Sequence, residues 1–200
     1  RAAWIDAGAG VALGHTRLEI LDLSPTGAQP MVSASGDLVL TYNGEIYNFR
    51  ELRARLESLG RTFRGTSDTE VLLEAFDAWG TVSALSRVDG MFAFALWDRR
   101  RRALTLGRDR MGEKPLYYGR LGERFAFASE LAALRALPGF DGAIDRDALT
   151  LFLRHKYVPA PHTIYHGVRK LPPASVLTVG DSGSIPEPTP YWSLFDLLAD

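Results

Sequence analysis

The 200-residue sequence contains no cysteine. Disulfide bonds, thiolate metal sites and a cysteine nucleophile are therefore excluded within these residues, and no metal site is predicted. No apolar run approaches the length that spans a bilayer, which argues against a membrane protein. A net charge of −1 provides no basic surface for nucleic acid. Neither a membrane nor a nucleic acid is expected as a partner.

The sequence also lacks an initiator methionine and a signal peptide, so we expect it to be a piece of a longer protein. Its 46% hydrophobic content is enough for one sizeable core. The last stretch, GDSGSIPEPTPYW, has the composition of a linker. We predict one domain over residues 1–180, followed by a linker over residues 181–200.

Two amphipathic helices are predicted after residue 47. In NFRELRARLESLG, leucines at helical spacing predict a helix that begins at Asn48. In SDTEVLLEAFDAWG, Ser67 is the expected N-cap, Glu70 stands in the reciprocal position of a capping box, and Gly80 ends the helix.

From residue 91 to residue 129 the apolar residues follow a period of two. The segments MFAFALWD, RALTLGRD, KPLYYGR and RFAFAS predict four successive strands of an antiparallel meander. In MFAFALW, large residues alternate with Ala93, Ala95 and Trp97, so neither face of that strand is polar. We therefore expect a sheet that is covered on both faces.

The stretch TYNGEIYNF, residues 41–49, contains Asn43-Gly44, the commonest two-residue hairpin signal. A helical pattern follows it where a hairpin would return as a second strand. The pair is therefore not expected to be a hairpin tip. Asn43, Gly44 and Glu45 are predicted to close a strand. Since no hairpin turn explains their polar groups, we ask whether these groups have a functional role.

Two further polar residues fall at notable positions: Arg17 within an apolar strand, and Asp68 at the start of the second helix. Each has an ordinary explanation, as a surface arginine or as an acid that favours the helix dipole. Together with Glu45 they suggest a binding site, because a guanidinium pairs with a carboxylate and an acidic side chain receives an ammonium. The set suits both ends of a free amino acid.

Asn43 and Gly44 add a second kind of chemistry. The side-chain NH2 of Asn43 and the backbone N–H of Gly44 are able to converge on one point, as donors that stabilise an oxyanion must. A glycine also lets a substrate approach the backbone closely. Spacing alone does not establish such a site.

Five ordered motifs resemble the amino-terminal glutaminase domain of glutamine-hydrolysing asparagine synthetases, which are class II glutamine amidotransferases. They are LGHTRLEILDLSPTGAQPM, YNGEIYNFRELR, GTSDTEVLLEAF, DGMFAFALWD and GRDRMGEKPLYYG. The resemblance continues through YVPAPHTIYHGVRKLPPAS and covers nearly the whole chain. It implies an α+β fold, the N-terminal-nucleophile hydrolase αββα sandwich of two antiparallel sheets between helical layers, here without its N-terminal segment.

The resemblance also implies a role for each residue of the site. Arg17 would bind the α-carboxylate of glutamine. Asp68, Glu45 and the carbonyl of Gly44 would receive its α-ammonium. Asn43 and the Gly44 N–H would form the oxyanion hole.

Two more residues and one segment are interpreted through the same resemblance. Backbone carbonyls near Ile20 and Leu21 would touch the substrate. The segment RDRMGEKPLYY is expected to be architectural, so neither Asp109 nor Lys114 is predicted to be catalytic.

The nucleophile of this family is a cysteine at the mature amino terminus, and the chain's own α-amine is its base. This sequence has no such cysteine and lacks the family's opening strand. Two explanations stay open: the upstream segment is not represented in this chain, or the domain is a degenerate amidotransferase that binds or scaffolds without hydrolysis. The chain alone is expected to be inactive in either case.

For the whole protein, the resemblance implies hydrolysis of glutamine to glutamate and ammonia, which a C-terminal synthetase domain would use for ATP-dependent amidation of aspartate. ATP and Mg²⁺ are expected in that domain, and no cofactor is expected in this one. A cytoplasmic homodimer is compatible with the resemblance. The alternative is a related class II amidotransferase that serves a different acceptor.

Overall fold

The computed structural model describes residues 2–16, 25–181 and 183–197, and the structural statements below concern these residues. The strands are β1 (Ala2–Asp6), β2 (Val11–His15), β3 (Met31–Val32), β4 (Leu38–Ile46), β5 (Gly90–Asp98), β6 (Ala103–Arg108), β7 (Tyr117–Leu121), β8 (Arg124–Ala128), β9 (Val168–Lys170), β10 (Ser175–Val179) and β11 (Thr189–Pro190). The helices are α1 (Phe49–Ser58), α2 (Asp68–Trp79), α3 (Thr81–Leu85), α4 (Leu131–Arg135), α5 (Arg146–His155) and α6 (Leu194–Leu197), with a short 3-10 turn at Pro25–Gly27.

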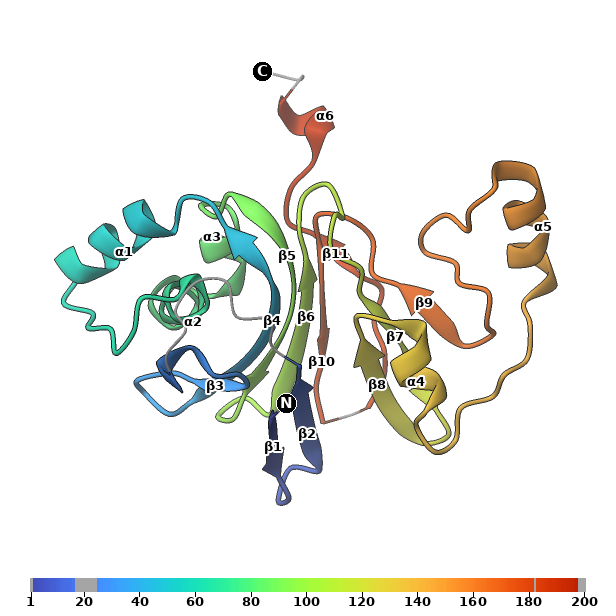
Figure 1. Ribbon diagram of the computed structural model, residues 1–200, viewed down its shortest axis with the longest axis horizontal. Helices are drawn as coiled ribbons and strands as arrows, with labels where there is room; N and C mark the ends of the chain where they lie inside the picture. Colours follow the sequence, from blue (N-terminus) through green and yellow to red (C-terminus); the bar gives the residue numbers. More distant parts are fainter. Residues whose placement is uncertain (1, 17–24, 182, 198–200) are drawn as a thin grey trace.

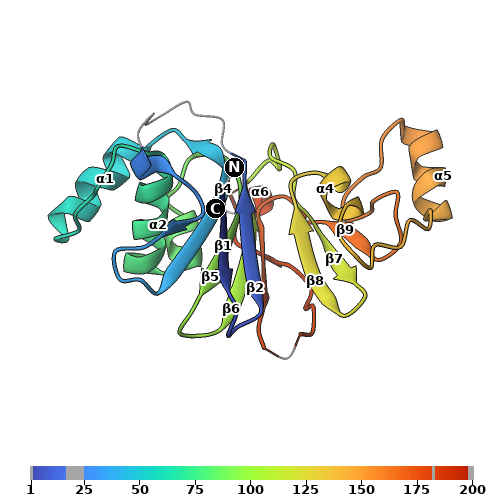
Figure 2. The ribbon, with the colours of Figure 1, turned by 60° about the horizontal axis from the view of Figure 1, so that its bottom comes forward.

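The strands form two main sheets. The larger has the order β11-β10-β6-β5-β4-β3 and the smaller the order β8-β7-β9, while β1 and β2 make a separate hairpin. All of these strand pairs are antiparallel. Helices α1–α3 lie outside the larger sheet, and α4 and α5 lie on the side of the smaller one (Figure 1). The hairpin lies between the two sheets (Figure 2). The predicted α+β sandwich is confirmed.

Strand β5 shows why the larger sheet is covered on both faces. Phe92 and Phe94 belong to the core under the helices, whereas Ala93, Ala95 and Trp97 belong to the core between the sheets. Successive side chains of a strand point to opposite faces, so one apolar segment serves two cores. The prediction of a doubly covered sheet is confirmed.

The predicted four-strand meander is wrong in its pairing. The four strands exist as β5 to β8, but β6 pairs with β5 and β10, while β7 pairs with β8 and β9. The chain crosses from the larger sheet to the smaller one between Arg108 and Tyr117. Alternation identifies a strand but not its partner, because both sheets are covered by apolar layers.

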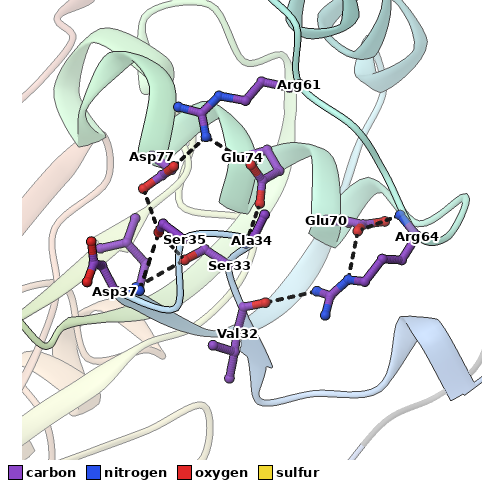
Figure 3. Close-up of polar contacts among 11 residues, drawn as sticks. Val32, Ser33, Ala34, Ser35, Asp37, Arg61, Arg64, Glu70, Glu74 and Asp77 are labelled. Atoms are coloured by element: carbon purple, nitrogen blue, oxygen red, sulfur yellow. Dashed lines mark hydrogen bonds and ion pairs between the residues drawn. The ribbon is translucent and has the colours of Figure 1, made fainter.

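Carboxylates of helix α2 bind the segments that pack around it (Figure 3). Glu74 is 1% exposed and accepts a hydrogen bond from the backbone N–H of Ala34 (2.9 Å). It also forms an ion pair with Arg61 (3.2 Å), which contacts Asp77 as well. These contacts tie α2 to the connection between β3 and β4 and to the connection between α1 and α2.

The start and the end of α2 follow the sequence prediction, with one difference. Ser67 accepts a hydrogen bond from the Glu70 N–H (3.2 Å), and Gly80 ends the helix with a positive φ of 77°. The Glu70 carboxylate, however, reaches back beyond the cap to the N–H groups of Arg64 and Gly65, each at 2.9 Å. The acid therefore anchors the preceding loop, because that loop offers two free donors.

The C-terminal stretch is attached to the larger sheet. Thr189–Pro190 pairs with β10, and the hydroxyl of Tyr191 donates to the carbonyl of Arg108 (2.9 Å). The domain limit at residue 180 stays a prediction. In the part of the chain that the structure describes, no helix is long and apolar enough to cross a membrane.

Candidate functional site

The candidate site begins in strand β4, which runs through the Asn-Gly pair. Asn43, Gly44 and Glu45 stay in register with β5, and the strand ends only at Ile46. The pair is not a hairpin tip, as predicted, and residues 43–45 form the end of the strand together with Ile46, one residue beyond the predicted limit. Asparagine and glycine are poor strand formers. Here a close approach of two strands requires the glycine, since a Cβ on Gly44 would lie 2.2 Å from the carbonyl oxygen of Met91.

The backbone N–H groups of β4 alternate between its two edges. The N–H of Tyr42 points away from β5 and donates to Oε1 of Gln29 (2.7 Å). The N–H of Ile46 points to the same edge and donates to Oδ2 of Asp68 (3.0 Å). Gly44 lies midway between these two residues, so its N–H faces this edge as well.

Asp68, the first residue of α2, closes this edge of β4. Its side chain is only 5% exposed. Its Oδ2 accepts hydrogen bonds from the Tyr42 hydroxyl (3.0 Å) and from the Ile46 N–H (3.0 Å). Because these two residues flank residues 43–45, one carboxylate oxygen holds both ends of the predicted oxyanion segment.

The electrostatics of this edge favour a cationic ligand. Burial raises the pKa of the Asp68 carboxyl above its usual value, and the nearby charge of Glu45 raises it further, while hydrogen bonds from Ile46 and Tyr42 act in the opposite direction. Within the described residues, neither Asp68 nor Glu45 forms an ion pair. A positive ligand would therefore stabilise the ionised form of Asp68.

Burial also raises the pKa of the Tyr42 hydroxyl, with the Asp68 charge as the second cause. Tyr42 therefore stays protonated and donates to the carboxylate. In the described ranges of the chain, no cluster of three or more His, Cys, Asp and Glu side chains is arranged to hold a metal ion.

A cavity of about 1330 Å³ lies beside this edge and is bounded by both sheets. Asn43, Gly44, Glu45 and Asp68 all line it. The side chains of residues 43 and 45 share one face of β4 because strands alternate, and this face is opposite to that of the buried Tyr42. Other parts of the wall come from the hairpin, from β5 and from the smaller sheet, including Leu13, Trp97, Phe125 and Phe127. Four of the predicted site residues therefore surround one space.

The other predicted site residues, Arg17, Ile20 and Leu21, lie outside the described residues. Their contacts with a substrate stay predictions. The residues that lead to this segment, His15 and Thr16, line the same cavity.

Sequence reasoning missed two residues that shape the site. Tyr42 links β4 to Asp68 through its hydroxyl. Gln29 links the same strand to α2, since its Oε1 accepts from the Tyr42 N–H and its Nε2 donates to Oγ1 of Thr69 (3.4 Å). The sequence gives no local signal for the contacts of Tyr42 and Gln29, because each contact joins residues more than ten positions apart. Tyr42 also belongs to an apolar core face, where a packed side chain is expected.

Comparisons with known proteins show to which family the chain belongs. The family described as glutamine amidotransferase domain matches residues 1–192. Asparagine synthetase [glutamine-hydrolyzing] 3 from Bacillus subtilis is 39% identical over 176 residues, which cover 86% of this chain and 28% of that protein. A putative glutamine-hydrolysing asparagine synthetase from Mycobacterium tuberculosis is 42% identical over 173 residues, covering 82% of this chain and 26% of that protein.

The solved structures give the same fold. Glutamine phosphoribosylpyrophosphate amidotransferase from B. subtilis is similar with a TM-score of 0.65 and 22% identity, over 90% of this chain and 35% of that one. The fold is therefore that of the class II amidotransferases among the N-terminal-nucleophile hydrolases, as predicted. The chain spans about a quarter of the length of the curated relatives named above. By sequence, fold and relatives, the chain belongs to the glutamine amidotransferase domain family.

Proposed function

We propose that this chain is the glutaminase domain of a glutamine-hydrolysing asparagine synthetase. The observation that carries the proposal is the carboxylate of Asp68, which holds Tyr42 and Ile46 on either side of Asn43 and Gly44. This arrangement supports the proposal, because the carboxylate would receive an ammonium beside the two groups that would donate to an oxyanion. Hydrolysis of the side-chain amide of a free amino acid needs both in one cavity.

The proposed reaction begins when a thiolate attacks the side-chain amide carbon of glutamine. The amide oxygen becomes an oxyanion, which the Asn43 amide and the Gly44 N–H stabilise. The carbon–nitrogen bond breaks, the leaving nitrogen takes a proton from the protonated α-amine base, and ammonia departs. Water then hydrolyses the thioester to glutamate and restores the thiol. The sequence has no cysteine, so the thiol comes from outside these 200 residues.

The acidic pair gives the substrate its orientation in this proposal. Asp68 and Glu45 receive the α-ammonium, and Arg17 binds the α-carboxylate at the other end. The Oδ1 oxygen of Asp68 keeps lone pairs for the ammonium, since the Tyr42 and Ile46 bonds both reach Oδ2. A glutamine within a peptide lacks the α-ammonium, so we expect free glutamine to be the substrate.

Ammonia release from glutamine tests the proposal, measured with the full polypeptide and with the 200-residue chain. We expect turnover by the full polypeptide and no activity above background from the chain, because the chain has no thiol. Ammonia release by the chain alone would contradict the need for a thiol. Binding of glutamine without turnover by the full polypeptide would favour a degenerate binding domain.

A second candidate is a class II amidotransferase with another acceptor. The observation that favours it is a relative whose name is not that of an asparagine synthetase, Amidase chry2 from Gibberella zeae, which is 33% identical over 195 residues and covers 97% of this chain. Formation of asparagine from aspartate, ATP, Mg²⁺ and glutamine by the full polypeptide distinguishes the two candidates. The synthetase domain, the cytoplasmic location and the homodimer belong to the first proposal.

Replacing Asp68 with asparagine should weaken glutamine binding by about tenfold to a hundredfold. The asparagine oxygen can accept the two bonds that reach Oδ2, so the fold is kept, but the uncharged side chain loses a charge-assisted contact worth ~1.5–3 kcal/mol. We also expect a higher melting temperature, because the burial that raises the pKa of Asp68 makes its ionised form unfavourable in the folded state. Calorimetric titration with glutamine and thermal unfolding of the full polypeptide measure both effects.

The pH dependence of binding follows from the same shift. The folded pKa of Asp68 is raised above its unfolded value, so its contribution favours folding below the unfolded pKa and is lost as the pH rises through the folded pKa. Glutamine binding requires the ionised carboxylate, so affinity should fall as the pH decreases through that raised pKa. Asp68→Asn should flatten this part of the pH profile. A variant that keeps the wild-type affinity and profile would show that Asp68 does not receive the ammonium.

A further inference from the structure

Asp109 follows the last residue of β6 and is 1% exposed. Its carboxylate accepts four hydrogen bonds from backbone N–H groups. Oδ1 accepts from Met111 (3.1 Å) and Glu113 (2.8 Å), and Oδ2 accepts from Phe92 (3.1 Å) and Lys114 (3.0 Å). With four donors already on its two oxygens, Asp109 acts on the backbone around it and not on a ligand.

Asp109 makes with Phe92 the two main-chain hydrogen bonds that a neighbouring strand would otherwise make. The ladder between β5 and β6 ends at Ala93 opposite Arg108. One residue further, the Asp109 N–H donates to the Phe92 carbonyl (2.8 Å), and the Asp109 carboxylate accepts from the Phe92 N–H. A single residue thus holds both main-chain polar groups of Phe92, where the chain leaves the larger sheet.

Phe92 is also the residue that lies directly opposite Gly44. The two are paired in register across β4 and β5. A Cβ on Gly44 would lie 2.6 Å from the Cα of Phe92, so the two backbones are in close contact. A displacement of Phe92 is therefore transmitted to Gly44. Catalytic donors need placement to within about 0.5 Å.

From these contacts we propose that Asp109 is a positioning residue for the oxyanion hole. It fixes the main chain of Phe92, and Phe92 fixes the direction of the Gly44 N–H. The proposal goes beyond an architectural role for this segment, because it assigns Asp109 an effect on turnover. The effect on turnover rests on the proposed function, whereas the effect on the main chain of Phe92 and Gly44 does not.

The variant Asp109→Asn in the full polypeptide tests this role. The amide keeps the shape of the carboxylate, but its NH2 opposes two of the four backbone donors. We expect kcat for glutamine hydrolysis, per reactive site, to fall by about tenfold or more while KM changes less than about twofold, since a displaced donor affects the transition state more than the ground state. Labelling with an electrophilic glutamine analogue counts the reactive sites, so unfolded protein does not contribute.

The matched control is Glu74→Gln. Glu74 is equally buried and also accepts a backbone N–H, but its contacts reach Ala34 and Arg61 and not β5 (Figure 3). We expect this variant to lower the melting temperature while kcat per reactive site stays within about twofold of wild type. If the loss of any buried carboxylate were enough to lower turnover, kcat per reactive site would fall equally in both variants.

A second readout does not require turnover. The amide resonance of Gly44 should move, and the amide of Phe92 should lose protection from hydrogen exchange, in Asp109→Asn but not in Glu74→Gln. Unchanged Gly44 and Phe92 signals, an unchanged kcat per site, or a KM increase as large as the loss of kcat would overturn the proposal. If the wild-type polypeptide shows no glutaminase activity, the proposed function fails, and the amide signals still decide the role of Asp109.

Discussion

Replacing Asn43 with alanine should lower kcat for glutamine hydrolysis by the full polypeptide by about a hundredfold to a thousandfold. KM should change by less than about threefold, because the amide donor gains strength only as the oxyanion develops. The side chain of Asn43 is exposed at the cavity, so its removal leaves the buried core intact. Steady-state measurement of ammonia release separates the two constants.

Asn48→Ala is the matched control for this variant. Asn48 also carries a side-chain amide, but its Nδ2 donates to the carbonyl of Arg87 (2.9 Å) and its Oδ1 accepts from the N–H of Asp89 (3.0 Å). Its loss should reduce stability and leave kcat within about twofold of wild type. If Asn43→Ala instead raised KM and left kcat unchanged, Asn43 would be a ground-state ligand and not an oxyanion donor.

Gly44→Ala should destabilise the protein strongly. The added Cβ would lie 2.2 Å from the Met91 carbonyl oxygen and 2.6 Å from the Cα of Phe92, so the two central strands would have to separate. Overpacking of this kind costs about 1–3 kcal/mol or more. For a domain of this size, ~3 kcal/mol lowers the melting temperature by about 6–12 °C. Thermal unfolding followed by circular dichroism measures the shift.

Gly14→Ala makes the same chemical change in strand β2, where a Cβ would meet nothing within 4 Å. Its melting temperature should stay within about 2 °C of wild type. Equal stability of the two variants would show that β4 and β5 are not in close contact at Gly44.

The sequence predicted the layers of the fold better than their connections. The pattern of β5 was sufficient to predict a sheet buried on both faces, because Phe92 and Ala93 point to opposite faces and neither is polar. The same alternation in β6 and β7 did not reveal that they belong to different sheets. The change of sheet occurs around Asp109, whose four backbone contacts span up to 17 residues and leave no periodic signal.

The sequence nominated candidate site residues but gave no indication of how the structure holds them. Residue chemistry and the family resemblance nominated Asn43, Gly44, Glu45 and Asp68, and the structure places all four around one cavity. The contact of Asp68 with Tyr42 was not predictable, because a tyrosine on an apolar strand face indicates only a packed side chain. Contacts between a helix start and a strand edge depend on tertiary geometry, which local patterns do not encode.

Between residues 41 and 46, β4 has a strand neighbour on one side only, among the strands that the structure describes. An open row of backbone groups invites another extended chain to add itself, which is a common route to aggregation. Gln29 and Asp68 engage the N–H groups of Tyr42 and Ile46 and leave the N–H of Gly44 between them. A small carbonyl compound can approach such an isolated donor, whereas an intruding polypeptide would need the whole row. Gln29 and Asp68 therefore engage two of the N–H groups that an added strand would need in order to pair with this edge.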